Sequence, residues 1–572
     1  MSTVTESHTS SILRDMQSPS RQLSSQPPMI SDLLEQQKEL TAVQRFSAFH
    51  ESESVVRHSH HYQDLIPLSA PTAGEQYAFE VDLDLCSGCK ACVSACHHLN
   101  GLQPAETWRQ VGMLLGTHET LPILQHVTTA CHHCLEPACL VGCPTEAYQK
   151  DPTTGVVRHL DDQCFGCQYC TMACPYEVPQ YLEVRGIVRK CDMCHQRLAV
   201  GEAPACVQAC PNQAIRITNV TKDDVERNVH KTSLLPGAPS SAITKPTTIF
   251  RSQRVNHADW RPADNGVLRP QHAHPALVLM LVLTQFSVGM ATPALWGNVN
   301  GTSCLLTLCL SLAMAILGIA AATCHLGRPL YAFRGMLGWR HSWLSREAIA
   351  FAMFLPTTGL LACRSLFGID ISASYNEIAT VANISLRHAT LSSSTMQLLE
   401  SAVPFVCGWI GVYCSARIYQ FTQRALWRGH RTLLRFGLTS VLGVAAGALL
   451  DSVVQNGSTT VPVVGMATLL VVKLCYEAMQ LLAVLTPDSP IYGSAQLMLH
   501  HLRYLTILRY GLGLTAIALL LLVAIRGLSE FGLWAVPILA LISGLIFAGE
   551  LVERTLYFKA VEPLRMPGGI SA

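Results

Sequence analysis

The sequence predicts an α+β domain at residues 78–218, followed by an all-α membrane bundle of about eight transmembrane helices at residues 273–560. Two observations predict this division. Sixteen of the 23 cysteines lie between Cys86 and Cys210, and apolar segments of bilayer-spanning length follow one another from about residue 275. Hydrophobic residues make up 49% of the chain and charged residues only 14%, which is low for a soluble protein. The net charge is +1, so no global basic field indicates nucleic-acid binding.

We expect residues 1–77 to be a largely disordered N-terminal segment with one helix. Residues 1–28 are rich in Ser, Thr and Gln and poor in aromatic residues, which is typical of disorder. In residues 30–47, apolar residues recur at roughly helical spacing, and this helix could cover its own domain or clamp onto a partner subunit. Residues 1–30 contain neither an apolar signal core nor a twin-arginine pair, so we expect no export.

The cysteines of the α+β domain form four groups, and their spacing predicts the chemistry. The groups are Cys86, Cys89, Cys92 and Cys96; Cys131, Cys134, Cys139 and Cys143; Cys164, Cys167, Cys170 and Cys174; and Cys191, Cys194, Cys206 and Cys210. The first and third groups match C-x2-C-x2-C-x3-C, the run of bacterial ferredoxins, in which three close thiolates bind one cubane and the fourth binds the other cluster of a pair. Sixteen iron ligands predict four [4Fe–4S] clusters in a ferredoxin-like domain.

Other cysteine chemistries fit the spacing less well. A disulfide framework would require a secreted chain, and a structural zinc site does not use a third C-x-x-C step. Residues 191–195 match the haem-attachment pattern C-x-x-C-H, but haem attachment would demand export. No histidine pair within the apolar segments has a spacing that suits b-type haem, so we expect no haem. The seven remaining cysteines lie in apolar runs, where they are expected to be small buried hydrophobic residues.

The membrane bundle is predicted from apolar segments, and its orientation from the arginines between them. The segments are about 275–296, 303–324, 348–367, 401–421, 434–451, 461–486, 505–526 and 531–552. Arginines gather in the second and fourth connections, at 325–347 and 417–435, on the same side as the N-terminus. The positive-inside rule therefore predicts a multi-pass protein of the bacterial inner membrane whose cysteine domain is cytoplasmic. Residues 219–272 are polar, as expected for a linker or for a tail wrapped over another surface.

Longer phrases in both halves resemble a known family. The cysteine domain contains CFGCQYCTMACPYEVPQY and VRKCDMCHQRLAVGEAPACVQACP, and over residues 78–218 it is similar to the iron–sulfur subunit of dimethyl sulfoxide reductase, a molybdopterin oxidoreductase. The membrane half resembles the anchor subunit of that enzyme in HPALVLMLVLTQFSVGM, in CHLGRP at 324–329 and in SREAI at 345–349. The family usually has two separate chains, and residues 1–77 have no counterpart in its iron–sulfur subunit.

The resemblance also implies how the cysteines share the clusters. Cys86, Cys89 and Cys92 would bind with Cys210; Cys191, Cys194 and Cys206 with Cys96; Cys131, Cys134 and Cys139 with Cys174; and Cys164, Cys167 and Cys170 with Cys143. The first of the four clusters would face the molybdenum subunit, and the last would face the membrane.

His325 and Glu347 are the candidate quinol-site residues. Quinol oxidation releases protons, and a histidine that titrates near neutral pH can accept one. A carboxylate at the start of a membrane span is costly without a role or a partner. The alternative is that His325 caps a helix end and that Glu347 pairs with Arg346 or Arg328. The resemblance implies a role in menaquinol handling for both, while Arg417 and Tyr419 are weaker candidates.

The sequence therefore predicts an electron-transfer and membrane-anchor subunit that relays electrons between membrane (mena)quinol and a molybdopterin-containing catalytic subunit in anaerobic respiration. Its partners would be that subunit, the quinone pool and the bilayer. The protein would oxidise quinol but would not itself transform the terminal substrate. One alternative is a stand-alone quinone-linked redox protein, and another is a subunit that feeds electrons into quinone from a different donor.

Overall fold

The structure is a computed structural model. It describes residues 62–118, 121–229, 233–254, 260–295, 302–367 and 393–568. The predicted N-terminal helix at 30–47 and the disorder expected around it lie outside the described residues.

Two small sheets frame the cysteine domain. In the first, β1 (Glu75–Asp82) pairs antiparallel with β8 (Ile215–Thr221) and parallel with β9 (Ile249–Arg251). In the second, β2 (Gln110–His118) pairs antiparallel with β3 (Leu121–Thr129) and with β10 (Arg261–Pro262). Residues on both faces of β1 are buried, so the first sheet lies inside the domain instead of on its surface.

The cysteine loops continue into short helices and hairpins. The helices are α3 (Ala91–Leu99), α4 (Ala138–Gly142), α5 (Tyr169–Ala173), α6 (His195–Ala199) and α7 (Ala205–Gln208), and the hairpins are β4 (Tyr148–Lys150) with β5 (Val157–His159) and β6 (Gln180–Leu182) with β7 (Ile187–Arg189). The loops of the first and third groups turn through Gly88 and Gly166, whose φ angles are 73° and 75°. Glycine adopts this left-handed conformation without steric cost, so the loop can fold tightly around its cysteines.

The described part of residues 219–272, expected to be a linker or a tail wrapped over another surface, packs on the cysteine domain. It contains α8 (Lys222–Asn228) and η3 (Ser241–Ile243), and it adds β9 to the first sheet and β10 to the second. Each added strand is two or three residues long. Strands this short leave no hydrophobic periodicity in the sequence, which is why the polar composition dominated the prediction.

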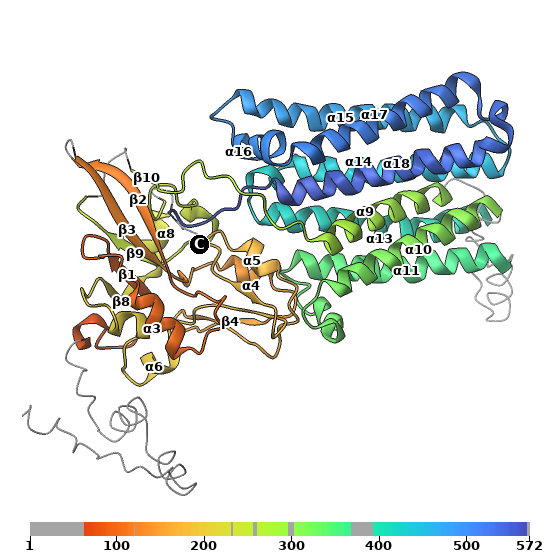
Figure 1. The fold of residues 1–572 in the computed structure, drawn as a ribbon. Helices are drawn as coiled ribbons and strands as arrows, with labels where there is room; N and C mark the ends of the chain where they lie inside the picture. Colours follow the sequence, from red (N-terminus) through yellow and green to blue (C-terminus); the bar gives the residue numbers. More distant parts are fainter. Residues whose placement is uncertain are drawn as a thin grey trace, which may run out of the picture. The chain divides into compact units, whose positions relative to one another are not determined.

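Among the described residues, eight helices are long and apolar enough to cross a membrane, so the predicted membrane bundle is confirmed. They are α9 (Pro275–Ala291), α10 (Thr302–Cys324), α11 (Trp343–Phe367), α13 (Ser393–Phe421), α14 (His430–Val454), α15 (Thr460–Leu481), α17 (Arg503–Arg526) and α18 (Ala535–Lys559). They lie side by side (Figure 1). Helix α9 is the most enclosed and contacts α10, α13, α14 and α18. It reaches α14 through Gly289 and Gly443, where a methyl group on Gly289 would lie 2.1 Å from a backbone oxygen.

The segment that follows α18 returns to the cysteine domain. The Met113 N–H of β2 donates to the Gly568 carbonyl at 3.0 Å, and Arg565 pairs with Asp264 at 2.8 Å. Met566 is buried in the core that contains Leu114. Both the segment that enters the membrane bundle and the one that leaves it therefore pack near β2.

Candidate functional site

The structure gathers the sixteen cysteines into four sets of four, and each set takes one cysteine from a distant group. Set A is Cys86, Cys89, Cys92 and Cys210; set B is Cys96, Cys191, Cys194 and Cys206; set C is Cys131, Cys134, Cys139 and Cys174; and set D is Cys143, Cys164, Cys167 and Cys170. The members of set A line one small cavity and those of set C another. In sets B and D, the thiols lie within electrostatic range of one another. These are the sets that the resemblance implied.

The donor geometry suits a cluster better than a single ion or a disulfide. All sixteen cysteines are free thiols. Within the described ranges, no three His, Cys, Asp or Glu side chains are placed to hold one metal ion. Four thiolates on one zinc ion all bind the same atom, so their sulfurs lie close together. In a cubane each thiolate binds a different iron atom, so the four sulfurs lie farther apart. Backbone N–H groups of Ala147 and Ala214 donate to the sulfurs of Cys143 and Cys210, each at 3.3 Å, as in iron–sulfur sites.

Burial favours the protonated form of several of these thiols. It raises the pKa of Cys96 to about 12 and those of Cys174 and Cys194 to about 11, with smaller contributions from neighbouring groups. Metal ligation requires the thiolate. Iron bound among the four sulfurs of a set would supply the positive charge that stabilises the thiolate form.

A glycine junction joins the set D loop to the loop after α10. The Arg328 N–H donates to the Phe165 carbonyl at 3.0 Å, and the Gly327 N–H donates to the Gly166 carbonyl at 3.4 Å. A methyl group on Gly327 would lie 2.2 Å from the Gly186 oxygen. Only glycine permits this approach, which explains the glycine in the phrase at 324–329 that carried the anchor resemblance.

Further bonds hold the other side of set D against the bundle. The Tyr169 hydroxyl, next to Cys170, donates to the Ile418 carbonyl of α13 at 3.0 Å. The Ser342 hydroxyl donates to the Gly142 carbonyl at 2.7 Å. Set D is therefore held directly against the membrane half.

His325 follows the end of α10 and lies beside another histidine. Its ring centroid is 5.3 Å from that of His274, which directly precedes α9. Burial, with a smaller effect of His272, lowers the pKa of His325. Burial, and then His325, His272 and Arg424, lower the pKa of His274 to about 4. Both imidazoles are therefore neutral near pH 7, and the buried His325 Nε2 and His274 Nδ1 find no hydrogen-bond partner within the described residues.

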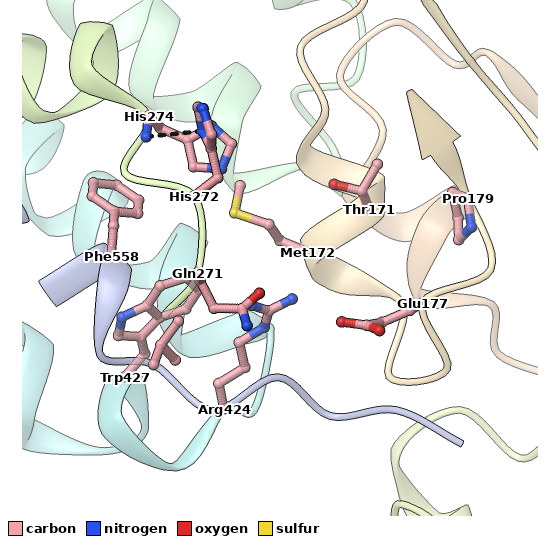
Figure 2. Close-up of a pocket in the computed structure, with 11 residues that line it drawn as sticks. Thr171, Met172, Glu177, Pro179, Gln271, His272, His274, Arg424, Trp427 and Phe558 are labelled. Carbon is pink, nitrogen blue, oxygen red and sulfur yellow. Dashed lines mark hydrogen bonds between the residues drawn. The ribbon is translucent and has the colours of Figure 1, made fainter. Parts of the chain in front are cut away.

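A cavity of about 240 Å³ lies next to His274 and between the two halves. Its lining residues are Thr171, Met172, Glu177, Pro179, Gln271, His272, His274, Arg424, Trp427, Phe558 and Val561. Figure 2 shows His272, His274, Trp427 and Phe558 on one side, and Met172, Thr171 and Glu177 on the other. Thr171 and Met172 follow Cys170 of set D and precede Cys174 of set C, so the cavity lies close to both sets.

Glu347 lies elsewhere on the junction and does not line this cavity. Its carboxylate accepts a hydrogen bond from the Ser415 hydroxyl and lies within electrostatic range of Tyr169. The two arginines that were the alternative partners of Glu347 bind backbone carbonyls instead. Arg346 donates to the Trp339 carbonyl at 3.0 Å, and Arg328 donates to the Asp161 carbonyl at 3.0 Å. Helix α11 begins at Trp343, earlier than the predicted span, so Glu347 lies within its first turns.

The two weaker candidates differ in their surroundings. Tyr419 packs edge-on against Trp427 and Phe558, with centroids 5.2 and 5.5 Å away, and so supports the cavity wall from behind. Arg417 stacks over Trp343 at 4.9 Å and does not line the cavity. Sequence reasoning missed His272, His274 and Arg424. The two histidines come just before the first predicted span, and this position could have identified them as candidate site residues.

Four sets of four cysteines docked on eight membrane-length helices define a membrane-anchored iron–sulfur electron-transfer protein. Comparison with known families gives the same result for each half. The family model for a 4Fe-4S dicluster domain matches residues 123–220, and that for the DMSO reductase anchor subunit (DmsC) matches residues 272–559. The protein belongs to the DMSO reductase family, and it joins the iron–sulfur subunit and the membrane anchor in one polypeptide.

Curated relatives match the iron–sulfur half. The B subunit of the anaerobic dimethyl sulfoxide reductase of Escherichia coli (strain K12) is 34% identical over 185 residues, covering 31% of this chain and 88% of the relative. The same subunit from Haemophilus influenzae is 32% identical over 190 residues, covering 32% and 91%. The "Hydrogenase-2 operon protein HybA" of Escherichia coli O157:H7 is 36% identical over 162 residues, covering 23% and 49%. The predicted family, fold class and electron-transfer function are confirmed.

Proposed function

We propose that this protein oxidises a membrane quinol in the cavity beside His274 and passes the electrons through four [4Fe–4S] clusters to a molybdopterin-containing catalytic subunit. The cavity is the observation that carries this proposal. Its walls come from α5 of the cluster domain on one side and from the anchor on the other. Quinol bound there would lie beside set D and set C, against residues of the half that matches the anchor family.

The chemistry of the lining suits a quinol. Trp427 and Phe558 supply flat apolar surfaces for the ring. His274 lines the cavity, and His325 lies outside the lining with its ring 5.3 Å from that of His274. Each neutral imidazole has one nitrogen that can accept a proton. Oxidation releases two electrons and two protons, and a positioned imidazole that accepts a proton typically contributes roughly 10²–10⁴-fold to the rate. Glu347 would act from outside the cavity, as a further proton acceptor close to Tyr169.

The order of the four sets supplies the electron path. Set D borders set C at Tyr148, which lies beside Cys139 and Cys170. Set C borders set B at Cys131 and Cys191, and set B borders set A at Cys206 and Cys92. Electrons would therefore pass from D through C and B to A. Cys89 of set A is exposed, as expected of the set that faces the catalytic subunit.

We also propose the direction of electron flow and the side of the membrane on which the cluster domain lies. The arginine-rich connection at 325–347 favours a cytoplasmic cluster domain in a bacterial inner membrane. The same cavity could reduce quinone if another donor supplied electrons, but the match to the DMSO reductase anchor family favours quinol oxidation. What the terminal substrate is depends on the partner subunit.

Quinol-driven cluster reduction in native membranes tests the cavity. We expect His325→Ala and His274→Ala to slow it by about 10²–10⁴-fold, while dithionite still reduces every cluster. His500→Ala is the matched control, because His500 is exposed and lies just before α17, away from the cavity lining. Reduction at the normal rate in both histidine variants would overturn the proposed quinol site.

A pull-down from native membranes tests the partner. Molybdenum or tungsten together with a large partner protein would support the relay. Iron recovered with this protein alone would contradict it and favour a stand-alone quinone-linked redox protein.

A further inference from the structure

Arg109 is a buried cation between set A and set B. It precedes β2 and is 2% exposed. Its guanidinium stacks over Phe79 at 4.7 Å and donates to the Thr128 hydroxyl at 3.2 Å. Thiols of both sets lie within its electrostatic range, among them Cys92 of set A and Cys206 of set B. Thr128 also lies 3.5 Å from the Cys92 sulfur, so Arg109 is held against the cluster loop.

Lys190 occupies the corresponding position between set B and set C. It is 3% exposed, and its Nζ lies 3.6 Å from the Cys131 sulfur of set C. The same ammonium donates to the carbonyl of Cys191, a set B residue, at 2.8 Å, and to the Val157 carbonyl. No carboxylate binds either Arg109 or Lys190 among the ion pairs of the described residues. Among the described residues, the cysteine sulfurs are the groups near enough to compensate these two charges once they bind iron as thiolates.

The third border has a different character. Tyr148 lies between set C and set D, beside Cys139, Cys143 and Cys170. Its phenol is buried and neutral. Two of the three borders are therefore occupied by a fixed positive charge, and the border nearest the membrane is occupied by an uncharged ring.

We propose that the buried positive charges of Arg109 and Lys190 raise the reduction potentials of the clusters on either side of each residue. This inference rests on the proposed four-cluster assignment. A cluster held by four thiolates gains a negative charge on reduction, and a nearby buried cation stabilises the reduced form more than the oxidised form. Set B lies between both cations, so its cluster depends on both, whereas the set D cluster has neither of them as a neighbour.

Redox titration of the full-length protein in native membranes, followed by electron paramagnetic resonance, tests the proposal. In Arg109→Gln we expect two of the four midpoint potentials to move to more negative values. In Lys190→Gln we expect two to move, one of which also moves in Arg109→Gln. Arg109→Lys and Lys190→Arg keep the charge and should restore the wild-type potentials. Arg227→Gln is the control, because Arg227 lies on α8 with its side chain 72% exposed.

Measuring the iron content distinguishes an effect of the two cations on the reduction potentials from a purely structural role. Full iron with unchanged potentials in Arg109→Gln and Lys190→Gln would overturn the proposal. Loss of iron in both, with iron retained in Arg109→Lys and Lys190→Arg, would also overturn it, because the charge would then be needed to retain the clusters. Dithionite and mediators set the potential, so the result does not depend on the quinol site. Fewer than four signals in the wild type would instead contradict the four-cluster assignment.

Discussion

Glu550→Gln is expected to destabilise the membrane bundle strongly. Glu550 of α18 is fully buried, binds the equally buried Lys473 of α15, and lies 3.0 Å from Arg509 of α17. Arg509 keeps a second partner after the substitution, because Glu477 lies 2.8 Å from it. Lys473 keeps the neutral Thr439 hydroxyl, at 2.6 Å, as its hydrogen-bond partner. The substitution therefore leaves one ammonium buried without a directly bonded counter-charge.

The size of the effect follows from this loss. Removing one partner of a buried ion pair costs about 3–5 kcal/mol, because the remaining charge stays out of water. Replacing both partners is much less harmful, so Lys473→Met combined with Glu550→Gln should recover most of the loss. Asp451→Asn is a matched control on α14. Asp451 is only half-buried and bonds Gln455, so we expect a change within about 0.5 kcal/mol.

The assay is the loss of helical circular dichroism from purified protein in detergent as sodium dodecyl sulfate is added. A Glu550→Gln protein that unfolds at the wild-type denaturant concentration would refute the reasoning. So would a double variant whose loss equals the sum of the two single losses, because the two charges would then not be coupled.

The two remaining predictions concern the junction and the topology. Gly327→Ala places a methyl group 2.2 Å from the Gly186 oxygen and should displace the anchor loop from set D. A displacement of about 1 Å can cost roughly 10²-fold in rate, so quinol-driven cluster reduction should fall while iron content holds. Gly359→Ala, where no atom lies within 4 Å, should leave it unchanged, and equal rates in both would contradict the junction. Leu330→Cys, at a residue 90% exposed, should react with an impermeant thiol reagent only from the cytoplasmic side; labelling of intact cells would reverse the orientation.

Local features made much of the fold and site predictable. Cluster ligands separated by two intervening residues, such as Cys86, Cys89 and Cys92, lie on one loop, so their spacing directly indicates the ferredoxin-type motif. The length of a membrane-spanning helix is dictated by bilayer thickness, so apolar runs report the bundle. Helix ends were harder to predict, because Glu347 is charged and yet lies inside α11, where Ser415 supplies its partner.

The electron path and its surroundings depend on residues far apart in the sequence. The strands β9 and β10 are too short for any periodicity to reveal, yet they complete both sheets. No sequence motif marks Arg109, and only folding places it between Cys92 and Cys206.

By itself, the sequence determined the kind of protein: a cysteine-rich electron-transfer domain joined to a membrane bundle, because motif spacing and apolar length are properties of short segments. Only the tertiary structure decided how the two halves meet. The cavity requires His274 at the start of α9, Trp427 after α13 and Phe558 on α18 to converge on α5 of the cluster domain. Convergence of that kind depends on helix packing and on close backbone approach at Gly327, and no local pattern records it.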